Sequence, residues 1–331
     1  MSSNRRRQYL IAAVALALPL AGLIQAQGKI HRIGILAPRS RSTPSNPNVY
    51  YDVIVQGLRE LGYIEGKNLV IEWRFADAKY ERLPRLAAEL VKSNVEVIVA
   101  VTTPAALALQ RATSTIPIVA VSVSDPVKTG LVTNLARPEG NITGLSNITS
   151  DTSPKLVQFL KDMIPAVSRV AALVNPSNAA TSNTFKKIQS AAIQRGIEIV
   201  PVSASTPEEI ERGFSTMTRE HAEAVIVVTD SFFLGQRSQI AVLAVTNRLP
   251  SASAIREEAL AGALISYGPD LLDTFRRAPI FVDKILRGTK PGELPFEQPT
   301  RLELVVNLKT ARQLGITIPP SILLRADEVI Q

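Results

Sequence analysis

The chain has 331 residues, a formal net charge of +8, 46% hydrophobic residues and a mean hydropathy of +0.13. This composition excludes a mostly disordered protein, and the length is comfortable for two lobes. The absence of cysteine excludes disulfides, thiolate metal sites and cysteine nucleophiles. His31 and His221, the two histidines, lie in unrelated segments, so we expect no metal site and no cofactor.

Residues 1–27 have the pattern of an export signal peptide. Three arginines at 5–7 precede an apolar stretch over 10–24, and Ala26 is a plausible cleavage position. The apolar stretch is short for a membrane-spanning helix, although an uncleaved anchor stays an alternative. The basic part resembles a twin-arginine signal, with Tyr9 where that pattern usually has Phe, and general secretion is the other route. We therefore expect a periplasmic protein cleaved near Ala26.

The remaining chain lacks a dense basic tract. Without the three N-terminal arginines its formal charge is +5, and all 29 acidic residues lie in this part. Dense basic patches are the electrostatic signature of nucleic-acid binding. We therefore expect no nucleic-acid partner.

From residue 30 onward, apolar strand patterns alternate with helix patterns. In the first half, strands are predicted at 30–37, 68–75, 95–101 and 118–123, and helices at 51–61, 83–92 and 104–111. In the second half, strands are predicted at 169–174, 197–202, 224–228, 250–254, 262–267 and 302–306, with helices between them. This alternation predicts an α/β fold with parallel sheets.

Polar residues follow several of these strands. In open α/β sheets, ligands bind in the crevice outside the carboxyl ends of the strands. Thr103 is expected to cap the helix at 104–111, with Pro104 as its first residue, so that free backbone N–H groups could hold a carboxylate. The candidate ligand-binding residues are Arg39, Ser40, Tyr50, Thr102, Thr103, Ser122, Asp125, Asn175, Asp230 and Phe232.

Each candidate also has a structural alternative. Asp230 could pair with a ligand ammonium, or it could only cap the following helix. Phe232 and Tyr50 could stack on a ligand, whereas Phe232 could equally belong to the core. Asp125 precedes Pro126 and so could form an Asp-Pro turn, and Arg39 could be a solvated surface residue.

The sequence carries no local catalytic motif. The patterns G-x-S-x-G, H-E-x-x-H, G-x-x-x-x-G-K-[ST] and G-x-G-x-x-G are all absent. Small hydroxyls, amides and carboxylates at strand ends can bind a solute without reactive pKa demands. We therefore predict no catalytic residues and a binding protein, while residues that meet only in space leave an enzyme as the alternative.

Two long segments resemble one protein family. These are DPVKTGLVTNLARPEGNITG at 125–144 and LPFEQPTRLELVVNLKTARQLGITIPPSILLRADEVIQ at 294–331. Both resemble extracytoplasmic solute-binding proteins of ABC transporters with the periplasmic-binding-protein type 1 fold, the family that includes tryptophan- and tyrosine-type binding proteins. The resemblance implies two Rossmann-like lobes with parallel sheets and a ligand cleft between them.

The resemblance also implies a domain division and a function. We expect one lobe from 28–147 plus 263–295 and a second from 148–262 plus 296–331. The implied function is a monomeric receptor that binds an amino acid or an organic or aromatic acid and serves an ABC transporter permease. The alternatives are a secreted α/β enzyme with a two-lobe cleft and a periplasmic sensor for a signalling partner. The solute and the permease are not identified by the sequence.

Overall fold

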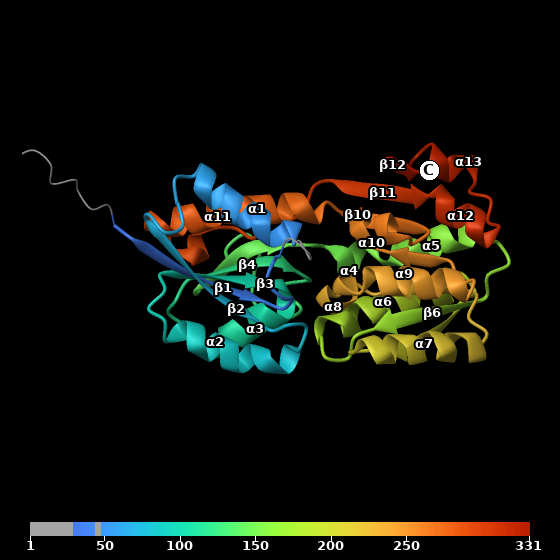
Figure 1. Ribbon diagram of the computed structural model, residues 1–331, viewed down its shortest axis with the longest axis horizontal. Coiled ribbons are helices and arrows are strands. Elements are labelled where there is room, and N and C mark those ends of the chain that lie inside the picture. The colour runs from blue at the N-terminus through green and yellow to red at the C-terminus, as the bar shows by residue number, and fades with distance from the viewer. Residues whose placement is uncertain (1–28, 44–47) are drawn as a thin grey trace, which may run out of the picture.

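The computed structural model describes residues 29–43 and 48–331. The expected export signal at 1–27 therefore lies outside the described residues. The chain forms two lobes that lie side by side along the longest axis of the molecule (Figure 1). No helix in the described residues has the length and apolar character needed to cross a membrane.

The first lobe is built on a five-stranded parallel sheet with strand order β2-β1-β3-β4-β5. The sheet can carry such apolar strands because helices cover both faces: α1 and α11 pack on one, α2 and α3 on the other. The elements in chain order are β1 (His31–Ala37), α1 (Val49–Glu60), β2 (Leu69–Phe75), η1 (Tyr80–Arg82), α2 (Leu83–Val91), β3 (Val97–Val101), α3 (Thr102–Ala112), β4 (Ile118–Val123) and β5 (Ile142–Ser146).

The second lobe contains a seven-stranded sheet with strand order β12-β11-β10-β9-β8-β6-β7. Adjacent strands in this sheet are parallel, except that β10 and β11 are antiparallel. Its elements are α4 (Thr149–Thr152), α5 (Pro154–Met163), β6 (Arg169–Val174), α6 (Ala180–Ile193), β7 (Glu198–Ser203), α7 (Pro207–Arg219), β8 (Ala224–Val227), α8 (Ser231–Gly235), α9 (Arg237–Thr246), β9 (Ser251–Ser253), α10 (Arg256–Ala261), β10 (Ile265–Pro269), β11 (Leu302–Asn307), α12 (Leu308–Leu314), α13 (Pro320–Leu323) and β12 (Glu328–Ile330).

The chain returns to the first lobe later than residue 263, where the expected division placed the crossing. Strand β10 pairs with β9 and β11 in the second sheet, and only the next helix, α11 (Leu271–Leu286), packs against the first lobe through α1 and β4. The last crossing is also later than residue 295. Phe296 is buried in the core of the first lobe, and Ser146 N donates to Glu297 O at 2.9 Å.

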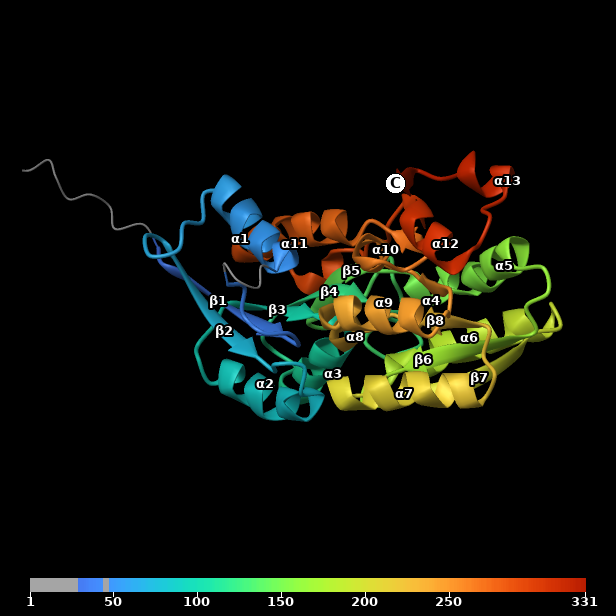
Figure 2. The same cartoon turned by 45° about the vertical axis from the view of Figure 1, so that its right-hand side comes forward.

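Three segments therefore connect the lobes: one after β5, one between β10 and α11, and one between residue 297 and β11. Strand β5 approaches β4 closely at Gly144, whose φ is +151°. A Cβ atom there would lie 1.8 Å from the Ala120 carbonyl oxygen, so glycine is required. Seen after a 45° turn, α2 and α3 still lie on the same side as α7 of the second lobe (Figure 2).

Candidate functional site

A cavity between the two lobes brings together the ends of several strands. About 660 Å³ of empty space lies within it when the open solvent at its mouth is counted. Its lining is Arg39, Tyr50, Tyr51, Val101, Thr102, Thr103, Ser122, Ser124, Asn147, Thr149, Asn178, Ala180, Thr184, Thr229, Asp230, Ser231, Leu234, Ile255, Leu271 and Phe275.

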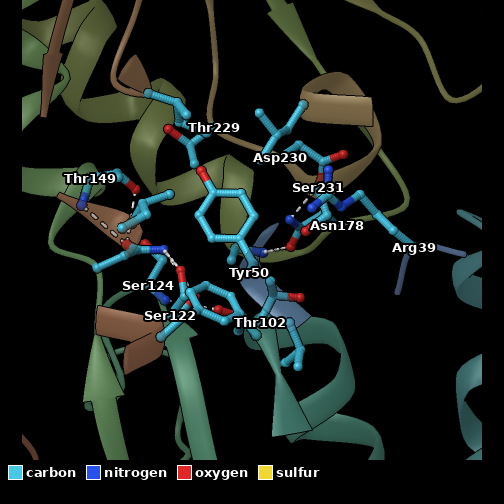
Figure 3. A pocket seen from close by; sticks show the side chains of 18 of the residues that line it. Arg39, Tyr50, Thr102, Ser122, Ser124, Thr149, Asn178, Thr229, Asp230 and Ser231 are labelled. Atoms are coloured by element: carbon cyan, nitrogen blue, oxygen red, sulfur yellow. Dashed lines mark hydrogen bonds between the residues drawn. The ribbon is translucent and has the colours of Figure 1, made fainter. Parts of the chain in front are cut away.

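Six of the ten candidate residues from the sequence line this cavity, and the labelled ones among them surround one space (Figure 3). Ser40, Asp125, Asn175 and Phe232 do not line it. The six are Arg39, Tyr50, Thr102, Thr103, Ser122 and Asp230.

The first-lobe wall of the cavity has a strained backbone. Thr102 follows β3 with φ +69°, and Ser122 near the end of β4 has φ +57°. A positive φ is costly for a β-branched residue such as threonine, and such strain concentrates at functional sites. The pairing of β4 with β5 also shifts register between Val121 and Val123, which places Ser122 in an irregularity of the strand. The strand ends are thus bent where they present hydroxyl groups to the cavity.

Thr103 does not cap its helix as expected. Helix α3 begins two residues earlier than expected, at Thr102, and its N-cap makes no side-chain hydrogen bond. The Thr103 hydroxyl instead accepts a hydrogen bond from the backbone N–H of Ser124 at 2.9 Å. Since Ser124 follows β4, this bond joins the ends of two neighbouring strands, and Thr103 has a bracing role beside the cavity.

Three buried hydroxyls of the lining have no hydrogen-bond partner among the described residues: Tyr50 Oη, Thr102 Oγ1 and Thr229 Oγ1. Burial raises the pKa of Tyr50 well above its ordinary value, and the nearby negative charge of Glu257 raises it further. An unpaired buried polar group costs about 1–3 kcal/mol. A polar ligand in the cavity would supply the missing partners.

Aromatic rings form the apolar part of the lining. The rings of Tyr50 and Phe275 lie 4.8 Å apart between centroids. The Arg39 guanidinium carbon lies 5.6 Å from the Tyr50 ring centre and 5.9 Å from that of Tyr51, within the range of cation–π contact. Arg39 Nη2 also donates to Asn48 Oδ1 at 2.7 Å, which fixes the side chain at the cavity rim. Arg39 is therefore a held residue rather than a solvated one.

Asp230 is the buried carboxylate of the cavity, with 3% of its surface exposed. Asn175 Nδ2 donates to Oδ1 at 2.9 Å, and Asn178 Nδ2 donates to Oδ2 at 2.8 Å. The backbone N–H of Phe232 donates to Oδ1 at 2.9 Å, so the side chain does cap α8 as the structural alternative supposed. Tyr80 Oη approaches both oxygens, at 3.2 and 3.1 Å.

These donors to Asp230 are neutral. Burial raises the pKa of Asp230 above its ordinary value, while the hydrogen bonds from both asparagines oppose the rise. No salt bridge to Asp230 occurs in the part of the chain that the structure describes. Asp230 thus lies in the cavity without a cationic partner among the described residues, and a cationic group of a ligand would favour its ionised form.

Two of the four residues outside the lining act in the second lobe. Asn175 is 2% exposed, and its side-chain amide donates a hydrogen bond to Asp230. Phe232 is 3% exposed and packs in the core, with its ring 5.4 Å from that of Phe233. The expected stacking of Phe232 on a ligand therefore gives way to a core role, which was the alternative.

Ser40 and Asp125 lie against neighbouring hollows. Ser40 is exposed beside Arg39 in a second hollow. Asp125 lies between the lobes outside the main cavity, where Asn183 Nδ2 donates to it at 3.3 Å and Lys187 Nζ lies 3.8 Å away. Its backbone has φ +43° and its carboxylate accepts from Lys128 N at 3.2 Å, as in the Asp-Pro turn considered above. Asp125 is an interlobe contact.

The structure adds residues that the sequence analysis did not select. Asn147 and Thr149 follow β5, and Thr229 and Ser231 follow β8, so the rule that selects strand-end polar residues could have found them. Phe275 and Leu271 come from α11 and carry no such local signal. Within the described residues, no group of three or more potential metal ligands comes together.

A family model for ABC transporter substrate binding proteins matches residues 42–330. The chain belongs to this family of substrate-binding proteins. The resemblance noted in the sequence is thereby confirmed, as is the expected α/β fold with parallel sheets in two lobes. The substrate-binding protein is 25% identical over 262 residues to a tyrosine-binding protein of Clostridioides difficile, a match that covers 79% of this chain and 75% of that one.

Solved structures agree with this assignment. A conserved domain protein from Vibrio cholerae is 28% identical with a TM-score of 0.83. An ABC domain from Streptococcus pneumoniae in complex with L-tryptophan is 26% identical with a TM-score of 0.82. Each match covers 91% of this substrate-binding protein and 100% of the compared chain.

Proposed function

We propose that the chain is a periplasmic receptor for an α-amino acid with an aromatic or large apolar side chain, and that it delivers this solute to an ABC transporter permease. The observation that carries the proposal is the buried, uncompensated Asp230 carboxylate in a cavity that also holds unpaired hydroxyls and aromatic rings. The relatives named for tyrosine and crystallised with L-tryptophan support the same ligand class.

The ligand's ammonium group would lie toward Asp230. Electrostatic attraction to a buried carboxylate is strong because little water screens it. This preference selects amines over neutral solutes and over simple organic acids. In the lining, Arg39 is the cation and Asp230 the anion, a balance that suits a zwitterion.

The carboxylate of the ligand would lie toward the first-lobe hydroxyls. Thr102 and Ser122 stand at the ends of β3 and β4, and the start of α3 adds the positive end of its helix dipole. The Thr102 hydroxyl lacks a partner among residues 29–43 and 48–331 and could donate to a carboxylate oxygen. The side chain of the ligand would then lie against the Tyr50 and Phe275 rings.

Closure of the lobes over the ligand would present one body to the permease. Hydrogen bonds already join the lobes at Tyr80–Asp230 and at Asn183–Asp125. We propose that the closed receptor acts as a monomer, without catalysis, and that the N-terminal segment directs export with cleavage near Ala26. Export would place the receptor where solute enters from outside.

The proposal is tested by native mass spectrometry of protein exported from its own signal segment and purified without denaturation. We expect a bound mass equal to one amino acid, removed by unfolding and restored by adding L-tyrosine or L-tryptophan. Titration calorimetry of the emptied protein should then show one site. A protein that carries no bound mass and shows no heat with any of the common amino acids contradicts the proposal.

A further inference from the structure

Tyr80 is a first-lobe residue whose hydroxyl reaches the second lobe. It starts the short helix η1, and its side chain is 6% exposed. Its Oη atom lies 3.2 Å from Asp230 Oδ1 and 3.1 Å from Asp230 Oδ2. The backbone N–H of Phe232 donates to Tyr80 Oη at 3.2 Å. The Tyr80–Asp230 contact joins residues 150 positions apart in different lobes, and Tyr80 reaches Asp230 from outside the lining of the main cavity.

The four hydrogen-bond donors to Asp230 come from different parts of the molecule. Asn175, Asn178 and the Phe232 N–H donate to the carboxyl group from within the second lobe. Tyr80 is a further donor, and among the described residues it is the one donor to Asp230 that belongs to the first lobe. The hydrogen bond from Tyr80 therefore forms only when the lobes are together, and the negative charge of Asp230 is left for the ligand's ammonium group to compensate.

We infer that Tyr80 is a positioning residue of the ligand site, which locks the closed lobes by holding the Asp230 carboxylate from the first lobe. This inference rests on the proposed function, because Asp230 would both attract the ligand's ammonium group and hold the lobes together through Tyr80. Separation of the lobes breaks the Tyr80 bond and leaves a buried carboxylate one donor short. Dissociation of the ligand must therefore break this bond first.

The variant Tyr80→Phe isolates this role. It keeps the ring, and it leaves Asp230 with its three second-lobe donors and α8 with its cap. The matched control is Tyr63→Phe, because Tyr63 Oη also donates to an aspartate, Asp283 at 2.8 Å, with both residues packed in the first lobe. Both variants lose one tyrosine–aspartate bond, but only the first loses a bond between lobes.

Interlobe distance and ligand dissociation are the two measurements. The chain has no cysteine, so spin labels can be placed at Ala88→Cys on α2 and Ser215→Cys on α7, exposed positions on the same side of the two lobes (Figures 1 and 2). Pulsed electron resonance then reports the distance between the labels, without ligand and with saturating L-tryptophan or L-tyrosine. Stopped-flow fluorescence reports the dissociation rate.

We expect Tyr80→Phe to shift the distance distribution toward longer values in both conditions and to speed dissociation about 10- to 100-fold, the range for a hydrogen bond to a charged group. Association should change far less, and Tyr63→Phe should match the wild type in all three measurements. Unchanged distances and an unchanged dissociation rate in Tyr80→Phe would overturn the inference, as would equal effects of both variants.

Failure of the proposed ligand class gives a different result. If the wild-type chain binds neither amino acid, that class is contradicted, and the distances without ligand still decide the role of Tyr80. A longer distance in Tyr80→Phe than in wild type and in Tyr63→Phe then supports the lock. Equal distances in all three proteins overturn it.

Discussion

The two walls of the cavity differ in how their polar groups are used. On the first-lobe wall, Thr102 and Ser122 have positive φ angles, and the hydroxyls of Tyr50 and Thr102 have no partner among the described residues. On the second-lobe wall, Asp230 accepts hydrogen bonds from three groups of its own lobe. One wall keeps open hydrogen-bonding capacity, and the other keeps a fixed charge.

This difference indicates how the receptor would divide recognition. A preorganised carboxylate needs no rearrangement to attract an ammonium group, so the second lobe would set the charge of the ligand. Unpaired hydroxyls and aromatic rings would set its polar pattern and shape. Thr229 adds one unpaired hydroxyl beside Asp230, but Tyr50, Thr102 and the aromatic rings lie on the opposite wall, so high affinity requires closure of the two lobes.

The largest effect is expected when the charge of the second-lobe wall is removed. Asp230→Asn should weaken amino-acid binding about 100-fold, because losing one partner of a buried charge pair costs about 2–5 kcal/mol. Titration calorimetry measures the loss, with thermal unfolding to verify the fold. Asp162→Asn on the exposed face of α5 is the control and should bind as the wild type does. Wild-type affinity in Asp230→Asn would contradict the claim that the second-lobe wall selects the charge of the ligand.

The second lobe buries another carboxyl group, that of Glu258. Its protonation state decides whether it adds a second negative charge to this lobe. Glu258 is 4% exposed on α10, and neither oxygen has a hydrogen-bond partner among the described residues. Burial raises the pKa of Glu258 to about 8, and the charges of Glu257 and Asp230 add to the rise while Ser253 and Arg237 oppose it. At pH 7 Glu258 is therefore mainly neutral.

The sign of the pH effect follows from proton release. In the unfolded chain Glu258 loses its proton near its ordinary pKa of 4.5, whereas the folded protein holds it to about 8. Its contribution to stability is full below about pH 4.5 and is lost as the pH rises to about 8. Glu258→Gln should remove this loss, about 2 kcal/mol between pH 5 and pH 7, measured by urea unfolding at both values. An identical pH dependence in the variant would mean that Glu258 is ionised when folded.

A smaller effect is expected on the first-lobe wall, where two neighbouring tyrosines differ. Tyr50 Oη has no hydrogen-bond partner in the described part of the chain, whereas Tyr51 Oη accepts from the Arg39 N–H at 3.3 Å. Without ligand, Tyr50→Phe should raise the free energy of unfolding by about 1 kcal/mol and Tyr51→Phe should lower it by about as much. With ligand, Tyr50→Phe should bind about tenfold more weakly. Equal stability changes in the two variants would show that the Tyr50 hydroxyl is not kept for a ligand.

The smallest effect is expected at Asp125, outside the main cavity. Its contacts with Lys187 and Asn183 are partly exposed and screened by salt. Asp125→Asn should change ligand affinity less than about threefold, and the change should vanish at high salt. A tenfold loss by calorimetry would extend the ligand site to this hollow.

Local sequence signals predicted much of the fold. The strand at residues 169–174 has the bounds of β6, because a short apolar run between polar turns leaves few alternatives. The strand-end rule likewise found Thr102, Ser122 and Asp230, since parallel strands bring their carboxyl ends to one edge. These predictions needed only patterns within a few residues.

Features that depend on distant contacts were not predictable in this way. Strand β10 belongs to the second sheet because it pairs with β9 and β11, and no local pattern selects those neighbours. Helix α3 starts at Thr102, and the Thr103 hydroxyl bonds Ser124 at the end of the neighbouring strand, a partner 21 positions away that no local pattern indicates. Tyr80 meets Asp230 across 150 positions, so its role appears only in the folded chain.

The central claim is that the Asp230 carboxylate selects the ammonium group of an amino acid. The direct measurement is a calorimetric comparison of L-tyrosine and L-tryptophan with their deaminated analogues, which keep the ring and the carboxylate. We predict that the better amino acid binds about 100-fold more tightly than its analogue in wild type, and that Asp230→Asn abolishes this ratio. Equal affinities for the amino acid and its analogue in the wild-type protein would contradict the account.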